Sequence, residues 1–450
     1  MSLFSILSNA SSALLNSQAQ IDVVSSNIGN AQNPNYNRRD ATVVSTSTGG
    51  ARVVNVTRAV DTALQGNYLT QSAASGGASY TSSLYSQLEA LTGSNQGSPT
   101  LSSNTQNLIA AWQSLQASPS VSGVAANVAQ ASQTLASGIQ TEVAGLDKLT
   151  QQVNTDLGSD LNTVNSLTTQ IAALNTQISG SLPNDSTKAG LEDNRDALVT
   201  QLSALVPIKV TANSDGTDTV STTSGVTLAT KTALQLSYNS GTNTVYGSGD
   251  TSQTSLNGAF TSGKVSAELG ALATDPASVA STNPSLAPIE KARQQLAAFA
   301  AQFTSPSSFN TAATSNGGVP MFTMTAGEAG TFAVNPAATV DPATASAVVT
   351  ALTATGTALT AVNVSSNSVL GLANAIATDQ TNRASTATTQ STAATSNLQA
   401  AQTAYKNSTG VSTDDQLTQL VTLQNAYSAA AKVISVVNEL QQTLFNSVNG

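Results

Sequence analysis

The densest group of charged side chains in the sequence is Glu192, Asp193 and Asp196 around Arg195. A pair of carboxylates is the catalytic apparatus of most glycoside hydrolases, in which one acts as acid and the other as base or nucleophile. One candidate function is therefore a secreted, carboxylate-dependent peptidoglycan hydrolase. We favour a structural interpretation, because these acids lie in the expected first turn of a helix, where the helix dipole already favours negative charge.

Composition removes most other catalytic chemistry. The 450 residues include no Cys and no His, which excludes His-dependent nucleophiles, thiolate or imidazole metal sites and disulfide bonds. Lys188 and Lys231 have many Ser and Thr nearby, but no motif frames either as the base of a Ser–Lys pair. We therefore expect a protein that is not an enzyme, with no catalytic residue, no metal site and no cofactor.

The chain carries little charge for its length. Charged residues make up 9% of the sequence, against roughly 25% in typical globular proteins. The 15 Lys and Arg are dispersed among 24 Asp and Glu, so they neutralise a phosphate backbone poorly and we expect no nucleic-acid binding. The uncharged polar bulk suits a surface that packs against copies of itself. Arg38 and Arg39 form a small basic spot, which we interpret as local or intersubunit ion pairs.

The start of the chain lacks the pattern of a cleaved secretory signal. Its first basic residue is Arg38 and the apolar residues before it are spaced, whereas a signal peptide has a basic start and a continuous apolar run. No stretch approaches the ~20 consecutive apolar residues of a transmembrane helix, so we expect no membrane span.

The two ends of the chain are the elements with the clearest pattern. Apolar and small residues alternate at spacings of four and three over the first 30 residues, which predicts a long amphipathic helix with a coiled-coil seam. The last 30 residues repeat this spacing, after Asp414 and Asp415 in the expected first turn. The large seam residues of the two helices are Leu3, Leu7, Leu14, Ile21, Val24 and Ile28, and Leu420, Leu423, Tyr427, Ile434, Val437 and Leu444. We expect these helices to pair with each other or with neighbouring subunits, although two ordinary core helices of one globular domain would show the same pattern.

The middle of the chain combines long helices with a short β-rich segment. A third heptad pattern predicts a helix over 139–178, roughly 60 Å long at 1.5 Å per residue, and a returning helix over 191–205 that Pro207 ends. From Ile208 the apolar period becomes two, which predicts a small antiparallel β domain over about 206–268. Helical spacing returns at 286–303 and 344–406. The fold class is therefore mainly α with a β insert, with long coiled-coil-like helices from both chain ends.

The turn after the first helix carries a motif. Residues 26–38, SNIGNAQNPNYNR, resemble the N-terminal motif of the family of flagellar rod, hook and hook-associated proteins, which usually reads N-I-A-N-x-x-T-P-G-Y. The matching positions are Asn27, Ile28, Asn30, Pro34 and Tyr36, and the chain departs from the motif at Gly29, Asn33 and Asn35. Residues 414–418, 424–427 and 438–440 resemble the C-terminal end of the same family.

Two internal segments are similar to a narrower family, hook-associated protein 1, which forms the first junction between hook and filament. These segments are LEDNRDALV at 191–199 and the heptad pattern at 170–178. The resemblance implies a structural subunit of the bacterial flagellum that forms the hook–filament junction and is required for filament assembly. It implies a homo-oligomer in a ring or helical lattice, hook protein and the second junction protein as neighbours, a cytosolic export chaperone, and an extracellular location reached by flagellar export.

The resemblance also implies a domain layout. An inner terminal-helix coiled-coil domain comprises 1–36 and 410–450, a helical rod domain comprises 37–205 and 269–409, and a small β-rich outer domain comprises 206–268. The seam residues named above are then the assembly interface, and Asn27, Asn30, Pro34 and Tyr36 shape the turn out of the inner domain. An alternative is another flagellar axial protein, either hook protein or the second junction protein.

Overall fold

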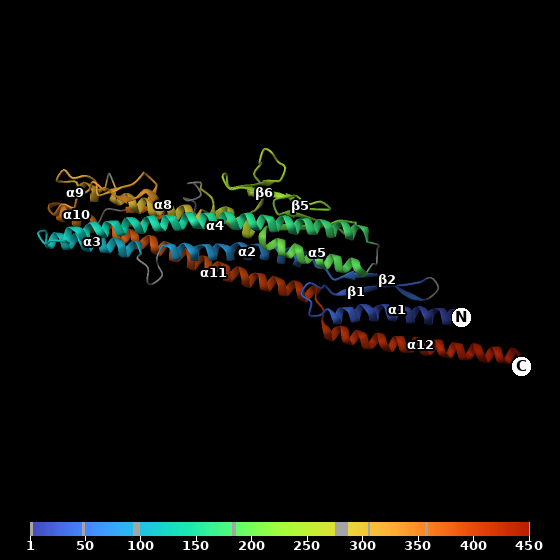
Figure 1. The fold of residues 1–450 in the computed structure, drawn as a ribbon. Coiled ribbons are helices and arrows are strands. Elements are labelled where there is room, and N and C mark those ends of the chain that lie inside the picture. Colours follow the sequence, from blue (N-terminus) through green and yellow to red (C-terminus); the bar gives the residue numbers. More distant parts are fainter. Residues whose placement is uncertain are drawn as a thin grey trace. The chain divides into compact units, whose positions relative to one another are not determined.

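A computed structural model describes residues 3–46, 50–92, 100–181, 186–274, 287–304, 307–355 and 359–449. The fold is mainly α with small antiparallel sheets, which confirms the predicted class (Figure 1). The contacts divide the chain into two compact units. Unit 1 comprises Met1–Ala73, Val164–Gln235 and Ser396–Gly450, and unit 2 comprises Ala74–Thr163 and Leu236–Thr395.

Long helices supply most of the chain. In order along the sequence they are α1 (Leu3–Gly29), α2 (Thr62–Leu91), α3 (Leu101–Ala117), α4 (Val124–Gly180), α5 (Ser186–Leu205), α6 (Gly263–Ala271), α8 (Pro288–Ala300), α9 (Ser308–Ala313), α10 (Ala345–Thr353), α11 (Val369–Thr409) and α12 (Thr413–Asn449). Short 3-10 turns lie between them at η1 (Asn257–Ala259), η2 (Ala301–Phe303), η3 (Ala329–Thr331) and η4 (Pro342–Thr344).

The strands pair only with neighbours in sequence. They are β1 (Arg39–Ser45) with β2 (Ala51–Arg58), β3 (Ile208–Ala212) with β4 (Asp218–Thr222) and β5 (Thr227–Ala229), β6 (Leu236–Asn239) with β7 (Thr244–Gly247), β8 (Phe322–Thr323) with β9 (Ala333–Val334), and β10 (Leu359–Ala361) with β11 (Val364–Ser366). All these pairs are antiparallel.

Unit 1 is built around the chain ends. α1 packs along α12 and also contacts the β1–β2 hairpin, which in turn contacts α5. The three-stranded sheet is attached to α4 by Asn175, which is fully buried. The Nδ2 of Asn175 donates to the carbonyls of Asp218 at 2.7 Å and Thr230 at 2.8 Å, and its Oδ1 accepts from the backbone N–H of Asp218 at 3.1 Å. One amide side chain therefore fixes β4 and the end of β5 to the helix.

Unit 2 has an aromatic core. Phe303 makes edge contacts with Phe299, Phe309 and Phe322 at centroid distances of 5.4, 5.5 and 5.6 Å, and Phe322 stacks on Phe332 at 4.8 Å. Edge-to-face and offset pairs of this kind are favoured by the ring quadrupole in addition to the area they bury. This cluster joins α8, η2, α9 and the β8–β9 pair into one core.

A charged network in unit 2 connects α8 to α11. Asp379 accepts from Lys291 at 3.0 Å, from Arg383 at 2.9 Å and from Gln295 at 2.9 Å. Lys291 and Gln295 are almost completely buried. The two cations and the amide lower the pKa of Asp379 even though burial opposes ionisation, so this carboxylate is the charged centre of the contact.

Several elements differ from the sequence-based expectations. α4 has 57 residues, whereas the heptad pattern predicted a helix over 139–178. The β1–β2 hairpin was not predicted at all. The segment 206–268 contains two separate sheets, and the boundary between the compact units falls between them at Gln235 and Leu236. Residues 182–185, between the expected helices over 139–178 and 191–205, lie outside the described residues.

The compact units are a different division of the chain from the three expected domains. Unit 1 contains both chain ends together with parts of the expected rod and β domains. The layout of 1–36 with 410–450, 37–205 with 269–409, and 206–268 stays a prediction.

Glu268 gives unit 2 a pH-dependent stability. Its side chain is fully buried, Lys264 Nζ lies 3.8 Å away, and Asp156, Asp160 and Tyr80 surround the pair. Burial, followed by the nearby Asp160, raises the pKa of Glu268 to about 9. Because the folded-state pKa is above the unfolded one, the protonated carboxyl stabilises the fold at low pH and this contribution is lost as pH rises toward 9.

We predict that the free energy of unfolding falls between about pH 6 and 8 by up to ~1.4 kcal/mol per pH unit for one such proton. Glu268→Gln keeps the shape of the side chain without its charge. Denaturant titrations at several pH values should therefore show that the free energy of unfolding of this variant depends less steeply on pH than that of the wild type. Some slope remains, because burial also raises the pKa of Glu142 to about 8. Glu328→Gln, on an exposed residue, is the control and keeps the wild-type slope. An unchanged slope in Glu268→Gln would contradict the assignment.

Candidate functional site

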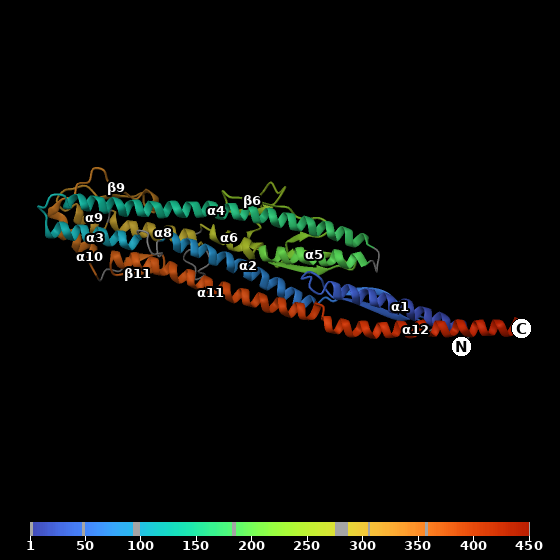
Figure 2. The same cartoon turned by 60° about the horizontal axis from the view of Figure 1, so that its bottom comes forward.

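The pairing of α1 with α12 is the most extensive contact between helices of unit 1 (Figures 1 and 2). On α1 the buried seam residues are Ala10, Ser17 and Val24, spaced by seven. On α12 they are Leu423, Ala430 and Val437, also spaced by seven. A buried position that recurs every seven residues on both helices follows the heptad repeat of a two-stranded coiled coil, in which the second core position of each heptad is here only partly buried. Small side chains at several of these positions allow the two backbones to approach closely.

The predicted interface residues lie on these two helices with unequal burial. Val24, Leu423 and Val437 are buried in the seam, and Leu444 is exposed near the end of α12. The partly buried remainder flanks the seam and consists of Leu3, Leu7, Leu14, Ile21, Ile28, Leu420, Tyr427 and Ile434. The structure therefore places the predicted residues on one helix pair, and their role in assembly stays a prediction.

A second apolar surface of α12 is left uncovered by the residues that the structure describes. We call it the open face, and its residues are exposed by between 42% for Val433 and 53% for Leu440. Exposed apolar area that is contiguous marks interaction sites more often than scattered single residues do. The open face comprises Val433, Val436 and Leu440, at positions i, i+3 and i+7 of α12. Leu417, Val421, Leu444 and Phe445 are also exposed on α12, and Leu444 follows Val437 by seven residues in the row of the seam. On α1, Phe4 and Leu15 are exposed.

Part of the last two helices is as apolar as a helix that crosses a membrane. Within Val369–Ser447 one 18-residue stretch meets that criterion by length and composition alone, and only 17% of the stretch is buried. Helices that pack on other helices meet the same criterion, so this is weak evidence for a membrane segment. The heptad seam gives the apolar residues another explanation, and the absence of a membrane span stays a prediction.

Asn27 connects the end of α1 to the start of α12 and to the turn between α1 and β1. Its Nδ2 donates to Gln416 Oε1 at 2.8 Å and to the Arg39 carbonyl at 2.9 Å. Its Oδ1 accepts from the Tyr36 hydroxyl at 2.8 Å and from the Arg39 N–H at 2.9 Å. The side chain is 1% exposed, and both donors and both acceptor positions are used. This residue type is therefore required by the geometry, since no other side chain offers two donors and two lone pairs at this length.

The other motif residues shape the turn. Asn30 Nδ2 donates back to the Ser26 carbonyl at 2.9 Å, and Pro34 lies in a turn in which the Tyr36 N–H donates to the Asn33 carbonyl at 3.2 Å. Tyr36 is buried, whereas Ile28 is partly exposed on α1. The motif thus ends α1 and brings Tyr36 back to Asn27.

The acidic cluster singled out in the sequence is an ion-pair network around Arg58, a residue that sequence reasoning missed. The guanidinium contacts Glu192 at 2.9 Å, Asp193 at 2.8 Å and Asp196 at 2.8 Å. Arg39 lies 3.6 Å from Asp193. Burial raises the pKa of Asp193, and the hydrogen bond and charge of Arg58 act in the opposite direction.

The explanation by the helix dipole is wrong for these acids. α5 begins at Ser186 and has no acid in its first turn, so Glu192 lies beyond the region in which the dipole acts. The acids instead bind β2 to α5 through Arg58. Arg38 pairs locally with Asp40 at 3.2 Å, as expected for a basic spot used in ion pairs.

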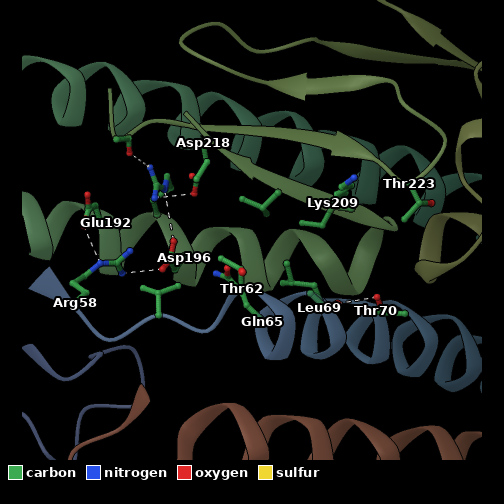
Figure 3. A pocket seen from close by; sticks show the side chains of 17 residues that line it. Arg58, Thr62, Gln65, Leu69, Thr70, Glu192, Asp196, Lys209, Asp218 and Thr223 are labelled. Atoms are coloured by element: carbon green, nitrogen blue, oxygen red, sulfur yellow. Dashed lines mark hydrogen bonds and ion pairs between the residues drawn. The ribbon is translucent and has the colours of Figure 1, made fainter. Parts of the chain in front are cut away.

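A cavity of about 670 Å³ adjoins the Arg58 network (Figure 3). Its wall includes Glu192, Asp196 and Asp218, and Figure 3 shows the labelled Lys209 and Thr223 on the opposite side. Asp218 contacts Arg195 at 2.8 Å, and burial raises the pKa of Asp218 to about 6. Each of the three carboxylates is thus bound to an arginine, so the arrangement is that of a structural network and not of a free acid–base pair.

We predict that Asn27→Ala weakens the attachment of α1 to α12. Truncation leaves the Tyr36 hydroxyl, Gln416 and the Arg39 backbone without partners, and each buried unpaired group costs about 1–3 kcal/mol. Hydrogen–deuterium exchange should therefore accelerate in α1 and in the first turns of α12. Asn30→Ala is the matched control, because Asn30 makes one exposed hydrogen bond and its loss should change exchange little. Equal effects of the two variants would contradict the role assigned to Asn27.

Comparisons with known proteins cover two segments of the chain. Residues 85–319 match the family described as the flagellar hook-associated protein FlgK helical domain, and residues 401–447 match the flagellar basal body rod FlgEFG protein C-terminal family. No curated protein matches the chain. Among solved structures, the flagellar hook junction protein FlgK from Burkholderia pseudomallei is similar over 58% of this chain and 47% of its own, with 23% identity and a TM-score of 0.48. The chain thus spans about half the length of that protein. Because the match to the helical domain covers more than half of the 450 residues, the chain belongs to the flagellar hook-associated protein FlgK helical-domain family.

Proposed function

We propose that this protein is a structural subunit of the bacterial flagellum that forms the junction between hook and filament and is required for filament assembly. Membership of the FlgK helical-domain family supports this proposal. The single observation that carries it is the pair of surfaces on α12. One surface is closed by α1, and the open face beside it is apolar and uncovered.

The two surfaces have different tasks in this proposal. The seam residues Val24, Leu423 and Val437 hold α1 and α12 together within a subunit. The open face packs against neighbouring subunits, which makes it a heterologous contact that repeats along a ring or helical lattice. Fully burying one large aliphatic side chain contributes about 1.5–3 kcal/mol, so several such side chains per subunit give a strong driving force.

The remaining parts of the proposal follow from the same role. The chain ends 1–36 and 410–450 form the inner part of the assembly, and the motif Asn27–Tyr36 directs the chain out of it. Hook protein and the second junction protein are the neighbours on either side, a cytosolic chaperone holds the chain before export, and the mature subunit works outside the cell. The protein has no catalytic task, because its clustered carboxylates are bound by Arg58 and Arg195.

The test is complementation of a deletion strain. We expect the deletion to leave hooks without filaments and to release flagellin into the medium, and the wild-type gene to restore filaments. Val436→Glu with Leu440→Glu places two charges on the open face, where burying them without partners is unfavourable. This variant should fold, with wild-type helicity by circular dichroism, and fail to restore filaments.

The control carries the same two charges elsewhere on α12. Asn438→Glu with Gln442→Glu alters exposed polar positions off the open face, and it should restore filaments. Loss of hooks in the deletion strain would instead identify a hook protein. Full complementation by the Val436 and Leu440 variant would overturn the assignment of the open face.

A further inference from the structure

The sequence contains three Asn–Gly pairs, and the structure gives two of them different surroundings. The pairs are Asn257–Gly258, Asn316–Gly317 and Asn449–Gly450, of which Gly450 lies outside the described residues. Asn257 is partly buried in η1, whereas Asn316 and Gly317 lie in an exposed stretch over 315–319 of unit 2. The proposed junction role uses neither of these two pairs.

An Asn–Gly pair can react with itself. The backbone nitrogen of the glycine gives up its proton and attacks Cγ of the asparagine, which closes a five-membered imide ring. The C–N bond to Nδ2 breaks, and Nδ2 leaves as ammonia with a proton in place of the lost bond. Water then opens the imide on either side and yields aspartate or isoaspartate. The net reaction consumes one water and releases one ammonia, and glycine favours it because no Cβ obstructs the attack.

The backbone at Gly317 leaves room for this ring. Gly317 has a φ of +83°, a conformation that glycine adopts readily, and a Cβ built there would meet no atom within 4 Å. The N–H of Gly317 donates to the Thr314 carbonyl at 2.9 Å. This bond must open before the nitrogen can attack, and because Gly317 is exposed, water replaces the lost partner at low cost.

A single hydrogen bond within the described residues holds the side chain of Asn316. Its Nδ2 donates to Asp341 Oδ2 at 2.9 Å, and this bond is exposed to solvent. Exposed hydrogen bonds exchange their partner for water with little loss of free energy. The side chain of Asn316 is therefore free to turn its Cγ toward the nitrogen of Gly317.

The side chain of Asn257 is held at both ends of its amide. Its Oδ1 accepts from the Val245 N–H at 2.8 Å, and its Nδ2 donates to the Asn243 carbonyl at 2.7 Å. Both bonds are partly buried and join η1 to the turn before β7 and to β7 itself. Rotation of this side chain would leave two backbone groups without partners, so the same dipeptide is protected at this position.

We propose that Asn316 is a site of covalent self-modification, at which the Gly317 nitrogen converts the side-chain amide into a carboxylate. The co-reactant is water from the solvent, and the products are ammonia and aspartate or isoaspartate. The exposed turn, the open space at Gly317 and the single hydrogen bond of Asn316 together carry this assignment. Asn257 lacks the free side chain and stays intact over the same time.

The modification reverses the sign of one contact in unit 2. Asp341 caps the start of η4 by accepting from the Ala343 N–H at 2.9 Å, and its other oxygen accepts from Asn316. These two donors lower the pKa of Asp341, so its side chain is ionised near neutral pH. A carboxylate at position 316 places a second negative charge against it, and like charges repel. The loop over 314–320 is then released from the start of η4.

The test is a time course on the full chain at pH 8 and 37 °C, read by chymotryptic digestion and tandem mass spectrometry. Cleavage after aromatic residues gives the peptides 310–322 for Asn316 and 247–260 for Asn257. A sample digested at time zero corrects for reaction during digestion. We expect deamidation at Asn316 to be faster than at Asn257 by about tenfold or more, because fewer and more exposed hydrogen bonds must open. Equal rates, or a faster reaction at Asn257, would overturn the proposal.

Two variants test the ring closure and its consequence separately. Asn316→Gln keeps the amide but would have to close a larger ring, so its peptide should gain no mass over the same time course, and a gain at the wild-type rate would contradict attack by Gly317.

Asn316→Asp reproduces the main charge change of the product. Hydrogen–deuterium exchange of this variant should be faster than that of the wild type over 314–320 and at Ala343, because the contact with Asp341 has become repulsive. Asn107→Asp adds the same charge at an exposed position of α3 and is the matched control, with wild-type exchange over 314–320. Unchanged exchange in Asn316→Asp, or an equal change in the control, would overturn the proposed release of the loop.

Discussion

The pairing of the first helix with the last is the interaction on which this protein depends. Asn27 and Gln416 are separated by 389 residues and share a buried hydrogen bond of 2.8 Å. This bond, the seam of Ala10, Ser17 and Val24 on α1, and the seam of Leu423, Ala430 and Val437 on α12 bring the two chain ends together. One surface of α12 packs against α1, and the exposed apolar side chains of α12 have no partner within the described residues of the chain. That imbalance supports the proposed interaction between subunits.

Many of the few charged side chains form ion pairs within one compact unit. Arg58, Arg195, Lys291 and Arg383 are all used in short ion pairs within their own unit. These pairs fix β2 to α5 and α8 to α11, so a large share of the few charges serves internal contacts. The polar surface that remains is mainly uncharged Ser, Thr, Asn and Gln, which permits close packing of copies without strong repulsion.

The sequence predicted the parts of the fold that depend on local periodicity. The heptad spacing located α1, α12 and most of α4, and the acids Asp414 and Asp415 mark the first turn of α12 as expected. It did not predict the β1–β2 hairpin, in which Val43–Val44 and Val53–Val54 are adjacent pairs that interrupt a period of two.

Contacts between distant segments were beyond sequence reasoning for a physical reason. The partner of Glu192, Asp193 and Asp196 is Arg58, which lies 134 or more residues away, and nothing local marks that arginine. The four hydrogen bonds of Asn27 likewise join three segments of the chain. The motif identified Asn27 as special, but only the fold shows what its amide does.

The most direct test of the central claim is the solvent accessibility of the open face before and after assembly. The chain has no cysteine, so Leu440→Cys introduces a unique thiol at a position that is 53% exposed. The rate of maleimide labelling should be high in the exported monomer. In purified flagella it should be lower by about tenfold or more, because packing protects the thiol. Equal labelling rates in the two states would show that the open face stays in solvent and would contradict the account.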